Sequence, residues 1–193
     1  MPYRTVHFAA GQYYHLYNRG VAGQPIFRDD GNYLFVLRLV KTYAAALHLA
    51  VIAYCLMPNH YHLLLRQDGE ASAGLLPQRV FNSYSKAFNK LRGRTGVLFE
   101  GRYQAVRVAE EGYVVHLCRY IHANPTKDRL VPLPEEWPYS NYLEWIDMRS
   151  GTLVDRSFLR GYFPVVESYR QFEMDYLAGL ARLPAGIEGY LLD

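Results

Sequence analysis

Hydrophobic residues in the first two thirds of the chain recur either at the period of a strand or at that of a helix. A run of β-forming residues stops before Gly20, and apolar runs lead into and out of a break at Pro58-Asn59. This break predicts two strands joined by a short turn. Alternation between apolar and polar positions indicates one more strand downstream. The four predicted strands are residues 13–18, 49–57, 60–66 and 101–109.

Three other stretches have helical spacing. Asp29 and Asp30 supply an N-cap and a first-turn carboxylate to the first helix, and Gly93 ends the second. The third helix begins at Glu110-Glu111 and is expected to end near Asn124, because the residue before a proline is pushed out of the α region. The predicted helices are residues 31–46, 75–91 and 111–124. The first is expected to bury Leu34, Leu37, Val40 and Ala44.

The order β-α-β-β-α-β predicts an α+β ferredoxin-like sandwich of the split βαβ kind. Two helices are expected to cover one face of the sheet and to leave the other open, with the third helix added at the end. We assign residues 1–145 to this domain and residues 146–193 to a short C-terminal extension that packs on it. One or two short helices are expected after residue 125.

Composition narrows the class of protein. Half of the 193 residues are hydrophobic and the net charge is +3, as in ordinary globular proteins. Cys55 and Cys118 lie in apolar runs without a C-x-x-C pair, which is typical of reduced thiols in a cytoplasmic protein. The apolar run 44–57 is interrupted by His48 and is too short to span a bilayer. We therefore expect a cytoplasmic protein with no membrane partner.

The run C-L-M-P-N-H-Y-H-L-L-L-R carries the first candidate chemistry. Side chains alternate along a strand, so His60 and His62 share one face and Tyr61 lies on the other. Two imidazoles at this spacing can hold one metal ion. A half-buried strand that carries two polar side chains accounts for the same pattern, so residues downstream have to decide between the two.

The predicted third helix carries two stripes. Its apolar stripe consists of Val114, Leu117 and Ile121, and its polar stripe of Tyr113, His116, Tyr120 and Asn124. A tyrosine hydroxyl can attack a phosphate that is polarised by a divalent ion, leaving a covalent phosphotyrosine. An amide oxygen from Asn124 added to two imidazoles suits Mg²⁺ or Mn²⁺. From spacing alone, both Tyr113 and Tyr120 qualify as the nucleophile.

Positive charge is concentrated in one part of the chain. No carboxylate lies between Glu70 and Glu100, and a one-signed run of this length favours a surface that binds phosphate groups. We therefore predict that this surface contacts nucleic acid. Its cations are Arg79, Lys86, Lys90, Arg92 and Arg94, followed by Arg102 and Arg107 on the next strand.

Three motifs in order resemble a known family. M-P-N-H-Y-H-L-L-L resembles the HUH motif of single-tyrosine transposases. G-V-L-F-E-G-R-Y-Q-A-V and R-Y-I-H-A-N-P are similar to the REP-associated tyrosine transposases, which are related to insertion-sequence enzymes. The resemblance covers about residues 12–142. It implies a ferredoxin-like fold and site-specific cleavage and rejoining of single-stranded DNA, often at hairpin-forming repeats.

The resemblance also implies roles for individual residues. His60 and His62 correspond to the metal ligands, Tyr120 to the nucleophile and Asn124 to an additional ligand on the same helix. Tyr61 departs from the family pattern, in which the middle residue is usually a plain hydrophobe. Its side chain is expected to point away from the metal.

The leading hypothesis is a metal-dependent single-stranded DNA endonuclease and strand transferase that uses Mg²⁺ or Mn²⁺ and acts on single-stranded or hairpin DNA. The alternative is a non-catalytic ferredoxin-like protein that binds single-stranded nucleic acid by stacking. A rolling-circle replication initiator shares the order of the motifs but is commonly longer. A relaxase would place its tyrosine near residues 13–17. Whether the protein is a monomer or a homodimer, and whether the tyrosine helix acts in cis or in trans, stay open.

Overall fold

A four-stranded sheet forms the centre of the computed structural model, which describes residues 6–192. The strands are β1 (Tyr13–Arg19), β2 (Leu49–Leu56), β3 (His60–Gln67) and β4 (Gln104–Val108). Their order is β2-β3-β1-β4, and all three pairings are antiparallel. The predicted ferredoxin-like α+β fold is confirmed.

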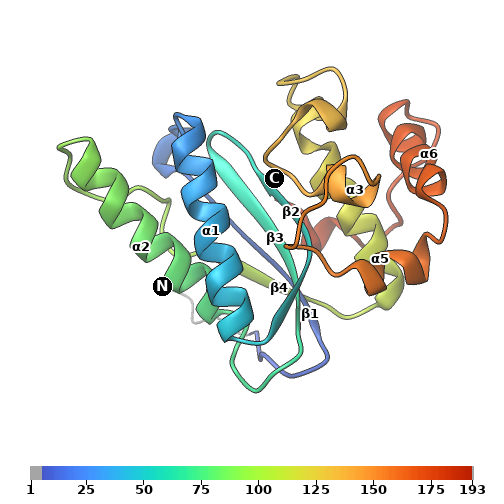
Figure 1. Ribbon diagram of the computed structural model, residues 1–193, viewed down its shortest axis with the longest axis horizontal. Helices are drawn as coiled ribbons and strands as arrows, with labels where there is room; N and C mark the ends of the chain where they lie inside the picture. Colours follow the sequence, from blue (N-terminus) through green and yellow to red (C-terminus); the bar gives the residue numbers. More distant parts are fainter. Residues whose placement is uncertain (1–5, 193) are drawn as a thin grey trace.

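Helices α1 (Asp30–Ala46) and α2 (Leu75–Leu91) cover one face of the sheet (Figure 1). The Asp29 carboxylate accepts a hydrogen bond from the Asn32 backbone N–H, as expected of an N-cap. The predicted buried stripe of α1 is partly wrong, because the Leu34 side chain is 52% exposed. Tyr33 is buried in its place, where its ring stacks on Tyr139 at a centroid distance of 3.7 Å.

The other face is covered as well, so the expected open face is wrong. Helix α3 (Glu111–Lys127) packs there together with α4 (Tyr142–Trp145), α5 (Arg156–Tyr162) and α6 (Val166–Leu177) (Figure 1). The apolar stripe of α3 forms one core with the later helices and the sheet. These helices cover the second face because the apolar stripe of α3 and the aromatic residues that follow it are buried there, away from water. Among the described residues after Lys127 there are three α-helices, rather than one or two.

Helix α3 runs past its predicted end. Pro125 lies inside it, and the helix stops at Lys127. In the last turn a proline removes one backbone hydrogen bond, while the turn that follows still closes through the Asp128 N–H and the Asn124 carbonyl at 2.9 Å. Asn124 therefore has a helical backbone one turn beyond Tyr120.

The predicted division at residue 145 stays a prediction; α4 ends there, and residues of α5 and α6 share its core. Residues 1–5 and 193, the outer ends of the two predicted segments, lie outside the described residues. Among the described helices, none combines the length and the apolar character needed to cross a membrane.

Candidate active site

Three histidines meet on the sheet face that α3 covers. His60 and His62 project from β3 toward this face, with ring centroids 5.0 Å apart. Tyr61 projects to the other face and stacks on Phe81 of α2. The third histidine, His15 of β1, stacks beside His62 at 5.2 Å. Strand alternation thus produces the arrangement of His60 and His62 that the sequence predicts.

A chain of hydrogen bonds fixes the proton positions in His15 and His62. His15 Nδ1 lies 2.5 Å from the Tyr190 carbonyl oxygen, which only accepts, so this nitrogen carries a proton. His15 Nε2 is then an acceptor, and His62 Nδ1–H donates a hydrogen bond to it at 3.0 Å. His62 Nε2 is left with a lone pair. It is buried and has no hydrogen-bond partner in the part of the chain that the structure describes.

His60 has the same tautomer for a separate reason. Its Nδ1 lies 2.8 Å from the Asn59 side-chain oxygen, so Nδ1 donates and Nε2 keeps its lone pair. Both strand histidines therefore present an unprotonated Nε2. This is the form that binds a metal ion.

Burial keeps these imidazoles neutral. Loss of hydration lowers the pKa of His15 to about 4 and that of His62 well below its usual value, and for His62 the neighbouring His15 and His60 add to the effect. Burial also lowers the pKa of His60, against the opposing influence of Asp128 and Asn124. In both strand histidines burial therefore favours the neutral form, in which a lone pair is available.

Tyr120 of α3 contacts the same site. Its ring meets His62 edge-on at a centroid distance of 5.6 Å. Tyr113, the other candidate on α3, donates instead to the Ala185 carbonyl and packs beside Tyr190. The geometry favours Tyr120 over Tyr113. A second tyrosine, Tyr17 of β1, also lies beside His62, at 6.2 Å.

Asn124 completes the set of predicted site residues. Its amide nitrogen donates to the Tyr120 carbonyl at 2.7 Å. The Asn124 side chain and His60 line the same pocket, which has a volume of about 440 Å³. Tyr120 and Asp128 line it too. His60, Tyr120 and Asn124 are thus brought together, with His62 behind them.

The last described residues cover the tyrosine. The Tyr120 hydroxyl donates to the Leu192 carbonyl at 3.0 Å and accepts from the Leu192 N–H at 3.3 Å. Leu191 and Leu192 line the pocket beside it. As a result, only 8% of Tyr120 is exposed. The last described residues therefore cover the Tyr120 hydroxyl.

The donor set suits an oxygen-seeking divalent ion with open coordination positions. Two neutral imidazoles and one amide oxygen are available, and within residues 6–192 no cluster of three or more His, Cys, Asp and Glu side chains is placed to hold a metal. The orphaned Nε2 of His62 fits a metal ligand better than a structural histidine, because an unpartnered buried nitrogen is costly.

The predicted DNA-contacting cations lie elsewhere. Helix α2 packs on the sheet face opposite His60 and His62, and strand alternation places Arg107 on that same face. Arg79, Lys86, Lys90, Arg102 and Arg107 are exposed there. Arg92 forms an ion pair with Asp29 at 2.8 Å, and Arg94 donates to the Val97 carbonyl. The structure therefore does not bring the basic stretch next to the histidine pair.

His15 is the residue that the sequence analysis missed. The available signal was the alternation of Tyr13, His15 and Tyr17 on the first strand, which places a histidine in the middle of one face. Its pairing with the strand of His62 depends on strand order, which the local pattern does not contain.

Comparisons with known proteins agree with this fold. The family model for IS200-like transposases matches residues 9–124. The solved structure of a REP-associated tyrosine transposase bound to a REP hairpin superposes with a TM-score of 0.65 at 13% identity, covering 80% of this chain and 94% of that one. A search of curated proteins found no significant match.

A second solved structure, a candidate transposase from Deinococcus radiodurans R1, gives a TM-score of 0.40 at 20% identity, over 63% of this chain and 95% of that one. The family model spans more than half of the chain and covers the predicted histidines, tyrosine and asparagine. This protein therefore belongs to the family of IS200-like transposases.

Proposed function

We propose that the protein nicks and rejoins single-stranded DNA through a covalent bond to Tyr120, in DNA transposition or on hairpin-forming repeats. The observation that carries this proposal is the buried Nε2 of His62, which has no partner in the described chain and lies beside Tyr120. Family membership supports a role on DNA. The related structure bound to a REP hairpin makes hairpin DNA the first substrate to test.

His60, His62 and Asn124 are the residues that would hold Mg²⁺ or Mn²⁺. A bound divalent ion supplies positive charge that polarises the scissile phosphate. His15 holds His62 in the tautomer that keeps its lone pair available. Tyr61 takes no part, since its ring packs on the opposite face.

The covalent step uses the Tyr120 oxygen as the nucleophile. A bond forms between this oxygen and phosphorus, and the bond from phosphorus to one sugar oxygen breaks. The phenol loses its proton, and the departing sugar oxygen keeps the electron pair and takes up a proton. Attack by a sugar hydroxyl on the phosphotyrosine reverses these events and rejoins a strand, so no external energy source is needed.

The test is a cleavage assay with labelled hairpin oligonucleotides taken from the sequences that flank the gene, in Mg²⁺ or Mn²⁺. We expect a protein–DNA adduct that resists denaturant and is absent with EDTA. Tyr120→Phe should abolish the adduct, whereas Tyr17→Phe and Tyr113→Phe, the matched controls, should keep it. An adduct that survives in Tyr120→Phe would show that the nucleophile is wrong.

The second candidate is a non-catalytic DNA-binding protein. Its supporting observation is that the exposed cations lie on the face opposite the histidines. It predicts DNA binding that weakens with salt, is unaffected by EDTA and is unchanged in His60→Ala. The leading proposal instead predicts that His60→Ala abolishes adduct formation.

A further inference from the structure

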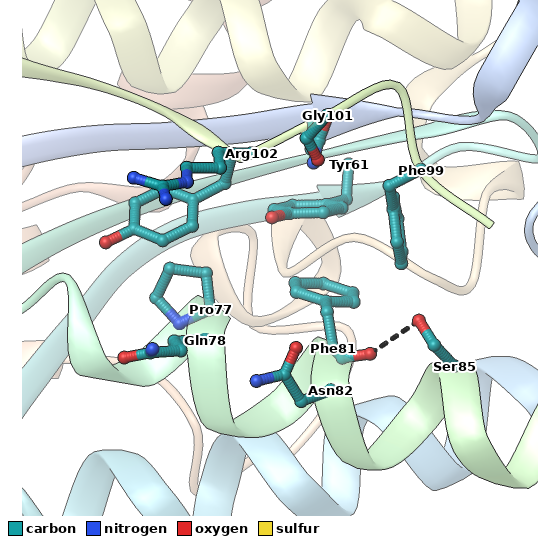
Figure 2. Close-up of a pocket in the computed structure, with 11 residues that line it drawn as sticks. Tyr61, Pro77, Gln78, Phe81, Asn82, Ser85, Phe99, Gly101 and Arg102 are labelled. Atoms are coloured by element: carbon teal, nitrogen blue, oxygen red, sulfur yellow. Dashed lines mark hydrogen bonds between the residues drawn. The ribbon is translucent and has the colours of Figure 1, made fainter. Parts of the chain in front are cut away.

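A second pocket, of about 450 Å³, lies on the face opposite the histidines (Figure 2). Helix α2 forms one wall, and the segment from Phe99 to Tyr103 forms the other. The floor lies where β1 ends and β3 begins. The lining residues used below are Tyr61, Gln78, Phe81, Asn82, Phe99 and Arg102.

Aromatic rings make up the deep part of this pocket. Tyr61 and Phe81 are buried and stack on each other at 3.8 Å, one above the other in Figure 2. Phe99 stands edge-on to both, at 5.2 Å from Phe81 and 6.0 Å from Tyr61, and is only partly buried. Tyr61 and Phe81 are almost fully buried and hold Phe99 in place, so Phe99 is a preformed ring that a ligand can reach.

The rim is polar and has no acidic residue among those that line it. Gln78 and Asn82 lie one turn apart on α2, and in the described part of the chain neither side-chain amide has a hydrogen-bond partner. Arg102 lies across the pocket from them (Figure 2). Exposed Arg79 and Lys86 continue the positive charge along the same helix.

A partly exposed ring held by a buried aromatic pair, two amides that both donate and accept, and a cation in a lining without acidic residues match one kind of ligand. Nucleobases offer a π face and a mixed hydrogen-bonding edge, and they carry a phosphate. We propose that this pocket binds one unpaired nucleobase of the DNA, with its edge toward Gln78 and Asn82 and its phosphate beside Arg102. This inference rests on the proposed function in taking DNA as the ligand.

The pocket and the catalytic site share one end of the sheet. Asn18 lines this pocket, and the next residue, Arg19, lines the pocket of Tyr120. On β3, His60 lines the catalytic pocket and Tyr61 lines this one. Strand alternation therefore places the two pockets back to back. A single strand that passes around this end can leave one base in the pocket while a nearby phosphate reaches Tyr120.

The test uses full-length protein carrying Tyr120→Phe, so that bound DNA stays intact. The probe is a fluorescein-labelled hairpin oligonucleotide with single-stranded flanks, prepared as a series in which each flank nucleotide in turn is abasic. We expect one abasic position to weaken binding roughly tenfold, as loss of one base–aromatic stack does. Adding Phe99→Leu should weaken binding of the intact probe and remove the effect of that abasic position.

Two charge-adding variants distinguish a loss of the pocket from general repulsion between added negative charge and DNA. Asn82→Asp adds a negative charge inside the pocket, and Ala87→Asp adds the same charge to an exposed site on α2 that does not line it. We expect Asn82→Asp to weaken binding several-fold more, with both variants melting at a similar temperature. The proposed base pocket is wrong if Asn82→Asp and Ala87→Asp weaken binding equally. It is also wrong if the same abasic position weakens binding with and without Phe99→Leu.

The outcomes separate the two proposals. If the wild-type chain cuts DNA but no abasic position weakens binding, the proposed nuclease activity holds and the proposed base pocket is wrong. If one abasic position weakens binding in a way that depends on Phe99, but no DNA is cut, the proposed base pocket holds and the proposed nuclease activity is wrong. If the protein binds no DNA, both proposals are wrong.

Discussion

His62 has one ring nitrogen with a hydrogen-bond partner and one without, among the described residues. His15 determines which of the two carries the proton. The Tyr190 carbonyl forces a proton onto His15 Nδ1, and the remaining proton positions follow from it. His15 thereby orients a proposed metal ligand. Residues that orient metal-bound histidines in this way typically change metal affinity by 10- to 100-fold.

His15→Ala should therefore weaken Mn²⁺ binding by roughly 10- to 100-fold, measured by calorimetric titration of the protein without DNA. Because a glutamine amide can also donate at one end and accept at the other, His15→Gln should recover part of the affinity. His7→Ala is the control, since His7 is exposed. Unchanged Mn²⁺ affinity in His15→Ala would mean that His62 is held by packing alone.

Glu173 is a second residue whose environment sets its charge. It is fully buried between α3 and α6, and its two carboxylate oxygens have no hydrogen-bond partner among the described residues. Burial raises the pKa of Glu173 well above its usual value, although Arg119 opposes the shift. The folded protein therefore keeps a proton that the unfolded chain releases above its ordinary pKa.

This difference predicts how stability changes with pH. Because the folded state binds the extra proton, Glu173 lowers the free energy of unfolding as pH rises from the unfolded pKa toward the folded one, by about 1.4 kcal/mol per pH unit. Glu173→Gln should remove this loss and stabilise the protein more at pH 8 than at pH 5. Melting curves at the two pH values test it. A stabilisation that does not grow with pH would show that Glu173 is ionised when folded.

At the scale of elements, local pattern accounted for most of what is observed. The strands, α1, α2 and the start of α3 follow from periodicity, and His60 and His62 share a face because β3 alternates. Leu34 shows the limit. Its spacing fits a buried stripe, but a stripe rotated by one residue includes Tyr33, whose ring gains more contact area.

What the sequence could not show depends on contacts between distant residues. His15 and His62 are 47 residues apart, and Tyr120 and Leu192 are 72 apart. Strand order and the path of the last described residues bring these pairs together. Neither is encoded in the spacing of hydrophobic and polar residues. The face taken by the basic stretch has the same origin, because α2 packs on whichever side its crossover from β3 allows.

At the scale of the whole molecule, the last described residues cover Tyr120, the proposed nucleophile. Ending the chain at Leu191 removes the contacts of Leu192 with Tyr120 and keeps the peptide carbonyl of Tyr190 that binds His15. We expect adduct formation to become faster. Leu192→Ala is the matched control, because its backbone contacts persist and its rate should stay near that of wild type. Equal rates for the truncated and wild-type chains would mean that the segment opens faster than the chemistry proceeds.

The arrangement of α3 also determines whether one chain is enough for catalysis. Tyr120 lies on the histidines of its own chain, and α3 is anchored there by the core that it shares with the sheet and α6. Exchange of this helix between two chains would have to break that core. We therefore expect catalysis in cis. His62→Ala and Tyr120→Phe should each be inactive, and a mixture of the two should stay inactive in the adduct assay at every protein concentration. Recovery of activity in the mixture, rising with concentration, would show that the tyrosine is donated by a second copy.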